Sequence, residues 1–109
     1  MSTTIDPGQQ FNAADSIAYA DGAVVSKTIL KKSSGNITLF AFDAGEGLSE
    51  HTTPHEALVQ VLDGSVEITI GDQVHKLVAG QALILPGGVP HAVKAIEKFK
   101  MMLTMIKSQ

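Results

Sequence analysis

The chain has 109 residues, of which 44% are hydrophobic and 17% charged, and its formal net charge is -3 at pH 7. That length allows one domain with one core and leaves no room for a second. The complete absence of Cys excludes disulfides, thiolate nucleophiles and thiolate-bound zinc, so His and carboxylates are left for any chemistry. All eight basic residues are Lys, and the acidic balance opposes binding to nucleic acid, which depends on clustered basic side chains.

The N-terminal sequence shows no targeting signal. Its first ten residues, MSTTIDPGQQ, lack the basic start and the apolar middle of a signal peptide, and no run of about 18 apolar residues in the chain could cross a bilayer. We therefore expect a cytoplasmic protein without a membrane partner.

Residues 1–22 are predicted to be a partly flexible N-terminal arm. The first ten are polar, and the segment NAADSIAYA at 12–20 fits a short helical turn or an arm that packs on the folded domain. Residues 23–109 are predicted to form that single domain.

Turn signals recur at short intervals after residue 22, and the segments between them are rich in Val, Ile, Leu and Thr, which is typical of an all-β sandwich or barrel. The segment VEITI at 66–70 alternates between apolar and polar residues, so we expect a strand with one face in water. The segments at 37–42 and 101–106 are apolar on both faces. They are predicted to be covered on both sides, either by a partner subunit or by the N-terminal segment.

Two spacings of Gly, Pro and His stand out between residues 45 and 95. The first runs Gly45, five residues, His51, one residue, Thr53, three residues, Ala57, six residues, Gly64; the second runs Gly80, five residues, Pro86, one residue, Gly88, two residues, His91, three residues, Ala95. They resemble the two motifs of the cupin superfamily, Gly-x5-His-x-His-x3/4-Glu-x6-Gly and Gly-x5-Pro-x-Gly-x2-His-x3-Asn. More narrowly, the chain resembles small single-domain cupins with a degenerate metal-ligand motif.

The resemblance implies a double-stranded β-helix, or jelly-roll barrel, whose motif histidines point inward and hold a divalent metal together with a glutamate. His51 matches the first motif histidine and His91 the second-motif histidine. Thr53 stands where a further histidine belongs, and Ala57 stands where the glutamate belongs. Two of the four ligands implied by the resemblance are therefore absent.

His55 could replace a missing ligand. In a straight strand, residues 51, 53, 55 and 57 share one face, so His55 would point into the barrel. Pro54 is expected to interrupt that alternation, which would leave His55 in a loop at the barrel mouth and could turn Glu56 inward instead. A metal site of His51, His55 and His91 is predicted, beside the alternative in which His55 faces solvent.

The other polar residues could have structural roles that involve no metal. His51 and His91 could be a pair satisfied by hydrogen bonds without metal. The hydroxyl of Thr53 could fill the ligand's place and bond locally. His75, outside both motifs, is predicted to be an exposed strand histidine.

The predicted ligand pocket lies inside the barrel. Phe40, Phe42 and Met101 would supply apolar walls, with Thr53 and Ala57 beside the histidines. Without Arg, and with no Lys in either motif, a neutral or weakly polar ligand is expected unless a metal is bound.

Two classes of function remain. A binding module would hold a small molecule in the barrel, with at most one weakly held divalent ion. A metal-dependent enzyme of the dioxygenase, isomerase or lyase type would use His51, His55 and His91 as ligands of Fe, Mn, Ni or Zn. The incomplete ligand set favours the binding module. A homodimer is expected in either case, since the resemblance implies one and the doubly apolar strands need cover.

Overall fold

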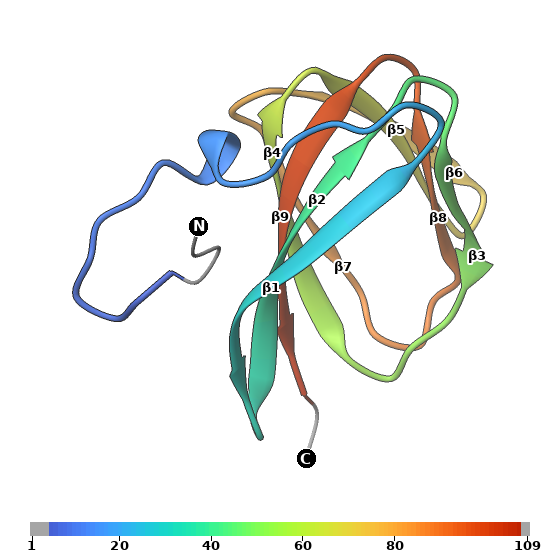
Figure 1. Ribbon diagram of the computed structural model, residues 1–109. Helices are drawn as coiled ribbons and strands as arrows, with labels where there is room; N and C mark the ends of the chain where they lie inside the picture. Colours follow the sequence, from blue (N-terminus) through green and yellow to red (C-terminus); the bar gives the residue numbers. More distant parts are fainter. Residues whose placement is uncertain (1–4, 108–109) are drawn as a thin grey trace.

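The computed structural model describes residues 5–107, and these form an all-β fold (Figure 1). One short 3-10 helix, η1, precedes the strands. The elements are η1 Ala13–Asp15, β1 Val24–Lys32, β2 Gly35–Phe42, β3 Gly47–His51, β4 Glu56–Asp63, β5 Ser65–Ile70, β6 Gln73–Val78, β7 Ala82–Leu85, β8 His91–Ala95 and β9 Phe99–Ile106. The all-β prediction is confirmed.

The strands form two antiparallel sheets that face each other. The five-stranded sheet has the order β1-β2-β9-β4-β7, and the four-stranded sheet has the order β3-β8-β5-β6. Strands distant in sequence are therefore neighbours, as where β9 pairs with both β2 and β4. Because β3 and β8 carry one motif histidine each and pair directly, this topology brings the two motifs together.

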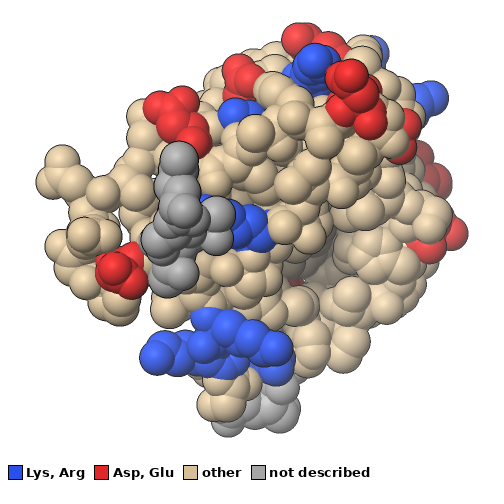
Figure 2. Space-filling view, in the orientation of Figure 1, with Lys and Arg blue, Asp and Glu red and all other residues tan. Residues whose placement is uncertain are grey.

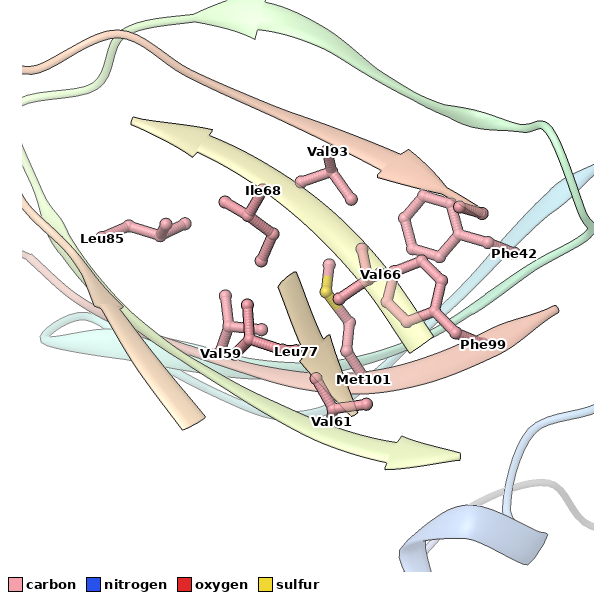
Figure 3. Close-up of a cluster of buried hydrophobic side chains, with 11 residues drawn as sticks. Phe42, Val59, Val61, Val66, Ile68, Leu77, Leu85, Val93, Phe99 and Met101 are labelled. Carbon is pink, nitrogen blue, oxygen red and sulfur yellow. The ribbon is translucent and has the colours of Figure 1, made fainter. Parts of the chain in front are cut away.

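The core fills the space between the sheets (Figure 3). Along β5, Val66 and Ile68 are fully buried while Glu67 and Thr69 are half-buried, so the predicted alternation is confirmed. At one end of the core the rings of Phe42 and Phe99 stack with centroids 4.5 Å apart. Full burial of such a side chain is worth roughly 1.5–3 kcal/mol, so this stack anchors that end of the barrel.

The N-terminal segment covers part of the outer face of the five-stranded sheet. We call residues 12–19 the strap. Ile17 of the strap is 7% exposed and packs against Leu39 and Ala41 of β2, both of which are 0% exposed. Lys100 donates a hydrogen bond from Nζ to the carbonyl oxygen of Ala14 over 2.6 Å, which ties the strap to β9. Of the two covers predicted for strand 37–42, the N-terminal segment is therefore the one seen here.

The rest of this outer face carries exposed apolar side chains. Leu30 is 46% exposed, Ile84 62% and Ile106 66%.

The predicted flexibility of the arm at 1–22 stays a prediction, and its residues 1–4 lie outside the described part. None of the helices formed by residues 5–107 has the length and apolar character needed to cross a membrane.

Candidate functional site

His51 and His91 lie side by side on the inner face of the four-stranded sheet. They are cross-strand partners between β3 and β8, and their ring centroids are 4.3 Å apart with the rings edge to face. His91 is only 7% exposed because it shares one face of β8 with Val93 and Ala95, and this face points to the core. His51 is exposed because β3 is an edge strand. The pair therefore has one ring at the edge of the core and the other at the barrel surface.

Backbone carbonyl groups fix the tautomer of both rings. Nδ1 of His51 lies 2.9 Å from the carbonyl oxygen of Ser49, and Nδ1 of His91 lies 3.4 Å from that of Val89. A carbonyl oxygen can only accept, so Nδ1 is assigned the proton in each ring. In the neutral rings Nε2 then carries a lone pair, ready to accept a hydrogen bond or to bind a cation.

His91 is held in its neutral form. Burial lowers the pKa of its imidazole below the usual value, the charge of a protonated His51 lowers it further, and the carbonyl of Val89 opposes the shift. At pH 7 the interior end of the pair is thus an acceptor and not a positive charge.

Thr53 uses its hydroxyl within its own loop. Its Oγ1 accepts a hydrogen bond from the backbone N–H of His55 and donates one to the carbonyl oxygen of His55, each over 3.1 Å. This closes a tight turn before β4. The local hydrogen bonding considered as an alternative for Thr53 is what the structure shows, and the side chain of His55, just past the turn, is half-buried.

At the start of β4 the alternation resumes with Ala57 inward. Ala57 packs against the core, whereas Glu56 pairs with Ile106 on the outer face and is exposed. The carboxylate of Glu56 therefore points away from the histidine pair.

His51 and His91 by themselves provide too few donors for a resident metal. Within residues 5–107, no three side chains among His, Asp and Glu are grouped so that they could hold a metal ion. The pair His51 and His91 supplies two nitrogen ligands, whereas metal centres in enzymes use three or more protein ligands. Membership of His55 in a ligand set stays a prediction.

The apolar residues predicted to line a pocket lie at different depths. Phe42 and Met101 are 0% and 1% exposed and belong to the packed core. Phe40 is half-buried, packs against that core, and its ring lies 6.0 Å from the ring of Phe42. Of the three, Phe40 is the one whose side chain reaches partly exposed space. That the three line a ligand pocket stays a prediction.

The loops that flank the histidines are clamped to each other. The N–H of Gly88 donates to the carbonyl oxygen of Thr53 over 2.7 Å. Gly87 lies so close to this loop that a Cβ added to it would be 2.5 Å from the carbonyl oxygen of Pro54. The clamp joins the loop after His51 to the loop before His91.

Figure 2 shows a hollow in the face of the molecule drawn there, between the β1–β2 hairpin and β3 as these lie in Figure 1. β3, which carries His51, and β1 are the edge strands at this side, so the hollow lies between the edges of the two sheets.

Sequence reasoning missed some polar residues on the inner faces. His75 is half-buried and pairs with Ile68, so it faces the interior side of β6, and the predicted exposed position was wrong. Thr28 and Thr38, a cross-strand pair of β1 and β2, were not singled out. The strand periodicity of DQVHKL, with Leu77 as the buried reference, could have placed His75 inward.

Relatives of known structure share this fold over nearly the whole chain. A conserved protein of unknown function from Streptococcus pyogenes is 29% identical, with a TM-score of 0.91 over 97% of this chain and 93% of its own. A cupin superfamily protein from Desulfitobacterium hafniense is 26% identical, with a TM-score of 0.89 over 98% of this chain and 97% of its own.

A curated relative, protein SchB of Streptomyces halstedii, is 34% identical over 70 residues, which are 63% of this chain and 51% of that protein. The chain thus spans about half the length of this relative. The model of the cupin domain family matches residues 38–107, a stretch that contains both histidines and both clamped loops. On that match and the shared architecture, the chain belongs to the cupin domain family, and its two sheets form the family's jelly-roll barrel.

Proposed function

We propose that this cupin binds a small neutral molecule in the barrel mouth, through hydrogen bonds to Nε2 of His51 and His91. The observation that carries the proposal is the pairing of the two rings: both Nδ1 atoms lie against backbone carbonyl oxygens, so Nε2 is assigned as the acceptor in each of two rings whose centroids are 4.3 Å apart. Two neighbouring acceptors call for a ligand that brings hydrogen-bond donors. Half-buried Phe40 and Ala57 would supply apolar contact below them.

A divalent ion is the other partner that two lone pairs could take. Two imidazoles would hold it weakly, with water completing its coordination, so we propose at most a loosely held ion and not a catalytic centre. The enzyme alternative needs His55 as a third ligand.

We also propose that the working unit is a homodimer. Its contact would be the exposed apolar part of the five-stranded sheet that the strap leaves uncovered, which includes Leu30, Ile84 and Ile106.

The binding proposal can be tested with phenol, a single ring with one hydroxyl donor. Nuclear magnetic resonance titration of the wild type with phenol should shift the Nε2 signal of His51 or of His91, because the hydroxyl donates its one proton to one of these two atoms. Whichever ring accepts this proton, its replacement in His51→Ala or His91→Ala should weaken phenol binding about fivefold, the effect of one hydrogen bond. Lys94→Ala, on the exposed outer side of β8, is the matched control and should leave the affinity unchanged.

Anisole, the methyl ether of phenol, keeps the ring and loses the donor. Equal affinity for anisole and phenol, or phenol binding that is unaffected by both histidine variants, would overturn the proposal. Metal content after purification without chelator decides the alternative. A near-stoichiometric metal that is lost in His51→Ala, His55→Ala and His91→Ala alike would establish a three-histidine centre.

A further inference from the structure

A row of hydroxyl groups lies on the sheet that faces the histidines. Ser26 and Thr28 of β1 pair with Phe40 and Thr38 of β2. The next pair in the same register on this face is Val24 with Phe42, whose ring is in the core. Side chains two residues apart share a face of a strand, so these hydroxyls point to the inner side. We call Ser26, Thr28 and Thr38 the hydroxyl lip.

The hydroxyl lip has hydrogen-bonding capacity to spare. Oγ1 of Thr28 lies 3.2 Å from Oγ1 of Thr38, so one of these hydroxyls donates to the other. The second proton and most of the lone pairs remain available. Ser26 and Thr28 are exposed and Thr38 is half-buried, although apolar residues occupy the same face deeper in the barrel. The lip thus lies at the opening and not in the packed core.

The lip and the histidine pair belong to opposite sheets. Facing sheets lie about 10 Å apart, so a small molecule bound between them could contact side chains of both. One wall offers two imidazole acceptors, and the other offers hydroxyls that can donate or accept. The hollow in Figure 2 lies between the elements that carry these two walls.

We propose that the hydroxyl lip recognises a second polar group of the ligand, at the end remote from the histidines. The ligand class is then a neutral single-ring molecule with a hydrogen-bonding group at each of two opposite ends. This inference rests on the proposed function, since it needs the first group to be held by His51 and His91.

A Thr–Thr pair across two strands also has a purely structural use, because such pairs stabilise sheets. The two roles separate when Thr is replaced by Val, which keeps the branched shape and removes the hydroxyl. A structural role predicts a change in stability alone. A recognition role predicts a change in the preference between two ligands that differ only in the second polar group.

The experiment compares phenol with 4-hydroxybenzyl alcohol, which adds a second hydroxyl at the opposite end of the ring. The wild type should bind 4-hydroxybenzyl alcohol about fivefold more tightly than phenol in nuclear magnetic resonance titrations, as expected for one added hydrogen bond. The double variant Thr28→Val, Thr38→Val should bind the two probes equally. Its affinity for phenol should stay at the wild-type value.

Thr69→Val is the matched control, because Thr69 is a half-buried strand threonine on the outer face of β5. It should keep the fivefold preference. A preference that survives in the Thr28→Val, Thr38→Val variant, or is absent from the wild type while phenol still binds at the histidines, would overturn the role of the lip and leave the proposed function intact. If phenol fails to bind at the histidines, the proposed function fails with it.

Discussion

His91 combines two properties that oppose protonation. It is 7% exposed, and its ring is edge to face with a second imidazole 4.3 Å away. Its neutral state is what allows Nε2 to act as an acceptor at pH 7, so the residue's burial and its proposed role in binding depend on each other.

The pH dependence of stability follows from the lowered pKa of His91. The unfolded chain takes up this proton near pH 6.5, above the pH at which the folded chain does. Between those two values the unfolded state binds more protons, so the free energy of unfolding should fall as the pH drops below about 6.5. Urea denaturation with EDTA present should show a smaller loss of stability between pH 7.5 and 5.5 in His91→Gln than in the wild type.

Gln73→Ala is the control for that measurement. Gln73 pairs with Ile70, which pairs with His91, so it lies in the same cross-strand row without a titratable group. This variant should keep the pH dependence of the wild type. An unchanged pH dependence in His91→Gln would contradict the account.

Single residues also mark the limit of prediction from sequence. His51 and His91 could be found because the cupin motifs give fixed spacings of Gly, Pro and His. The turn formed by Thr53 could not, because either a straight or a bent chain is compatible with Thr-Pro-His. Thr28 was missed because nothing in the sequence of β1 tells which face of an edge strand turns to the barrel mouth.

Among the elements, the strands were more predictable than the loops. The period-two pattern of 66–70 sufficed for β5, and the apolar run at 37–42 predicted that β2 is covered on both faces. The clamp between the loops at 52–55 and 86–90 depends on two segments more than 30 residues apart, whose approach no local pattern encodes.

Position 87 is where the clamp has the least room for a side chain. A Cβ at position 87 would lie 2.5 Å from the carbonyl oxygen of Pro54, so Gly87→Ala should force the two loops apart. We expect a loss of about 1–3 kcal/mol in the free energy of unfolding by urea, together with a change in the ring signals of both histidines.

Gly88→Asn is the comparison, since a Cβ there has open space and Asn tolerates its φ of +78°. It keeps the N–H that bonds to Thr53, so its ring signals should resemble those of the wild type. The same spectra in Gly87→Ala as in the wild type would show that the clamp does not set the geometry of the pair.

At the scale of the whole molecule, the five-stranded sheet has a divided outer face. The strap covers Leu39 and Ala41, while Ile84 and Ile106 beyond it remain exposed. The sequence indicated that these strands need cover, but it could not assign one part of the face to the chain's own N-terminal segment. This exposed apolar area is the basis of the proposed dimer contact.

The homodimer is tested by charging that surface. Ile84→Lys should convert a dimer at micromolar concentration into a monomer in size-exclusion chromatography with light scattering, because it places an ammonium group in an apolar contact. Val74→Lys is the matched control: Val74 is 55% exposed against 62% for Ile84, and it lies on the four-stranded sheet. A monomeric wild type, or an equal effect of the two variants, would exclude this contact.

The position of β9 in the five-stranded sheet has a consequence for how the chain folds. Among residues 5–107, β9 is the last strand, and it lies between β2 and β4, which pair with it and not with each other. During synthesis, β2 and β4 therefore each keep one edge without its partner strand until residues 99–106 have emerged. A ribosome that stalls before Phe99 would present two unpaired apolar edges, which are the natural target of a chaperone that recognises extended segments.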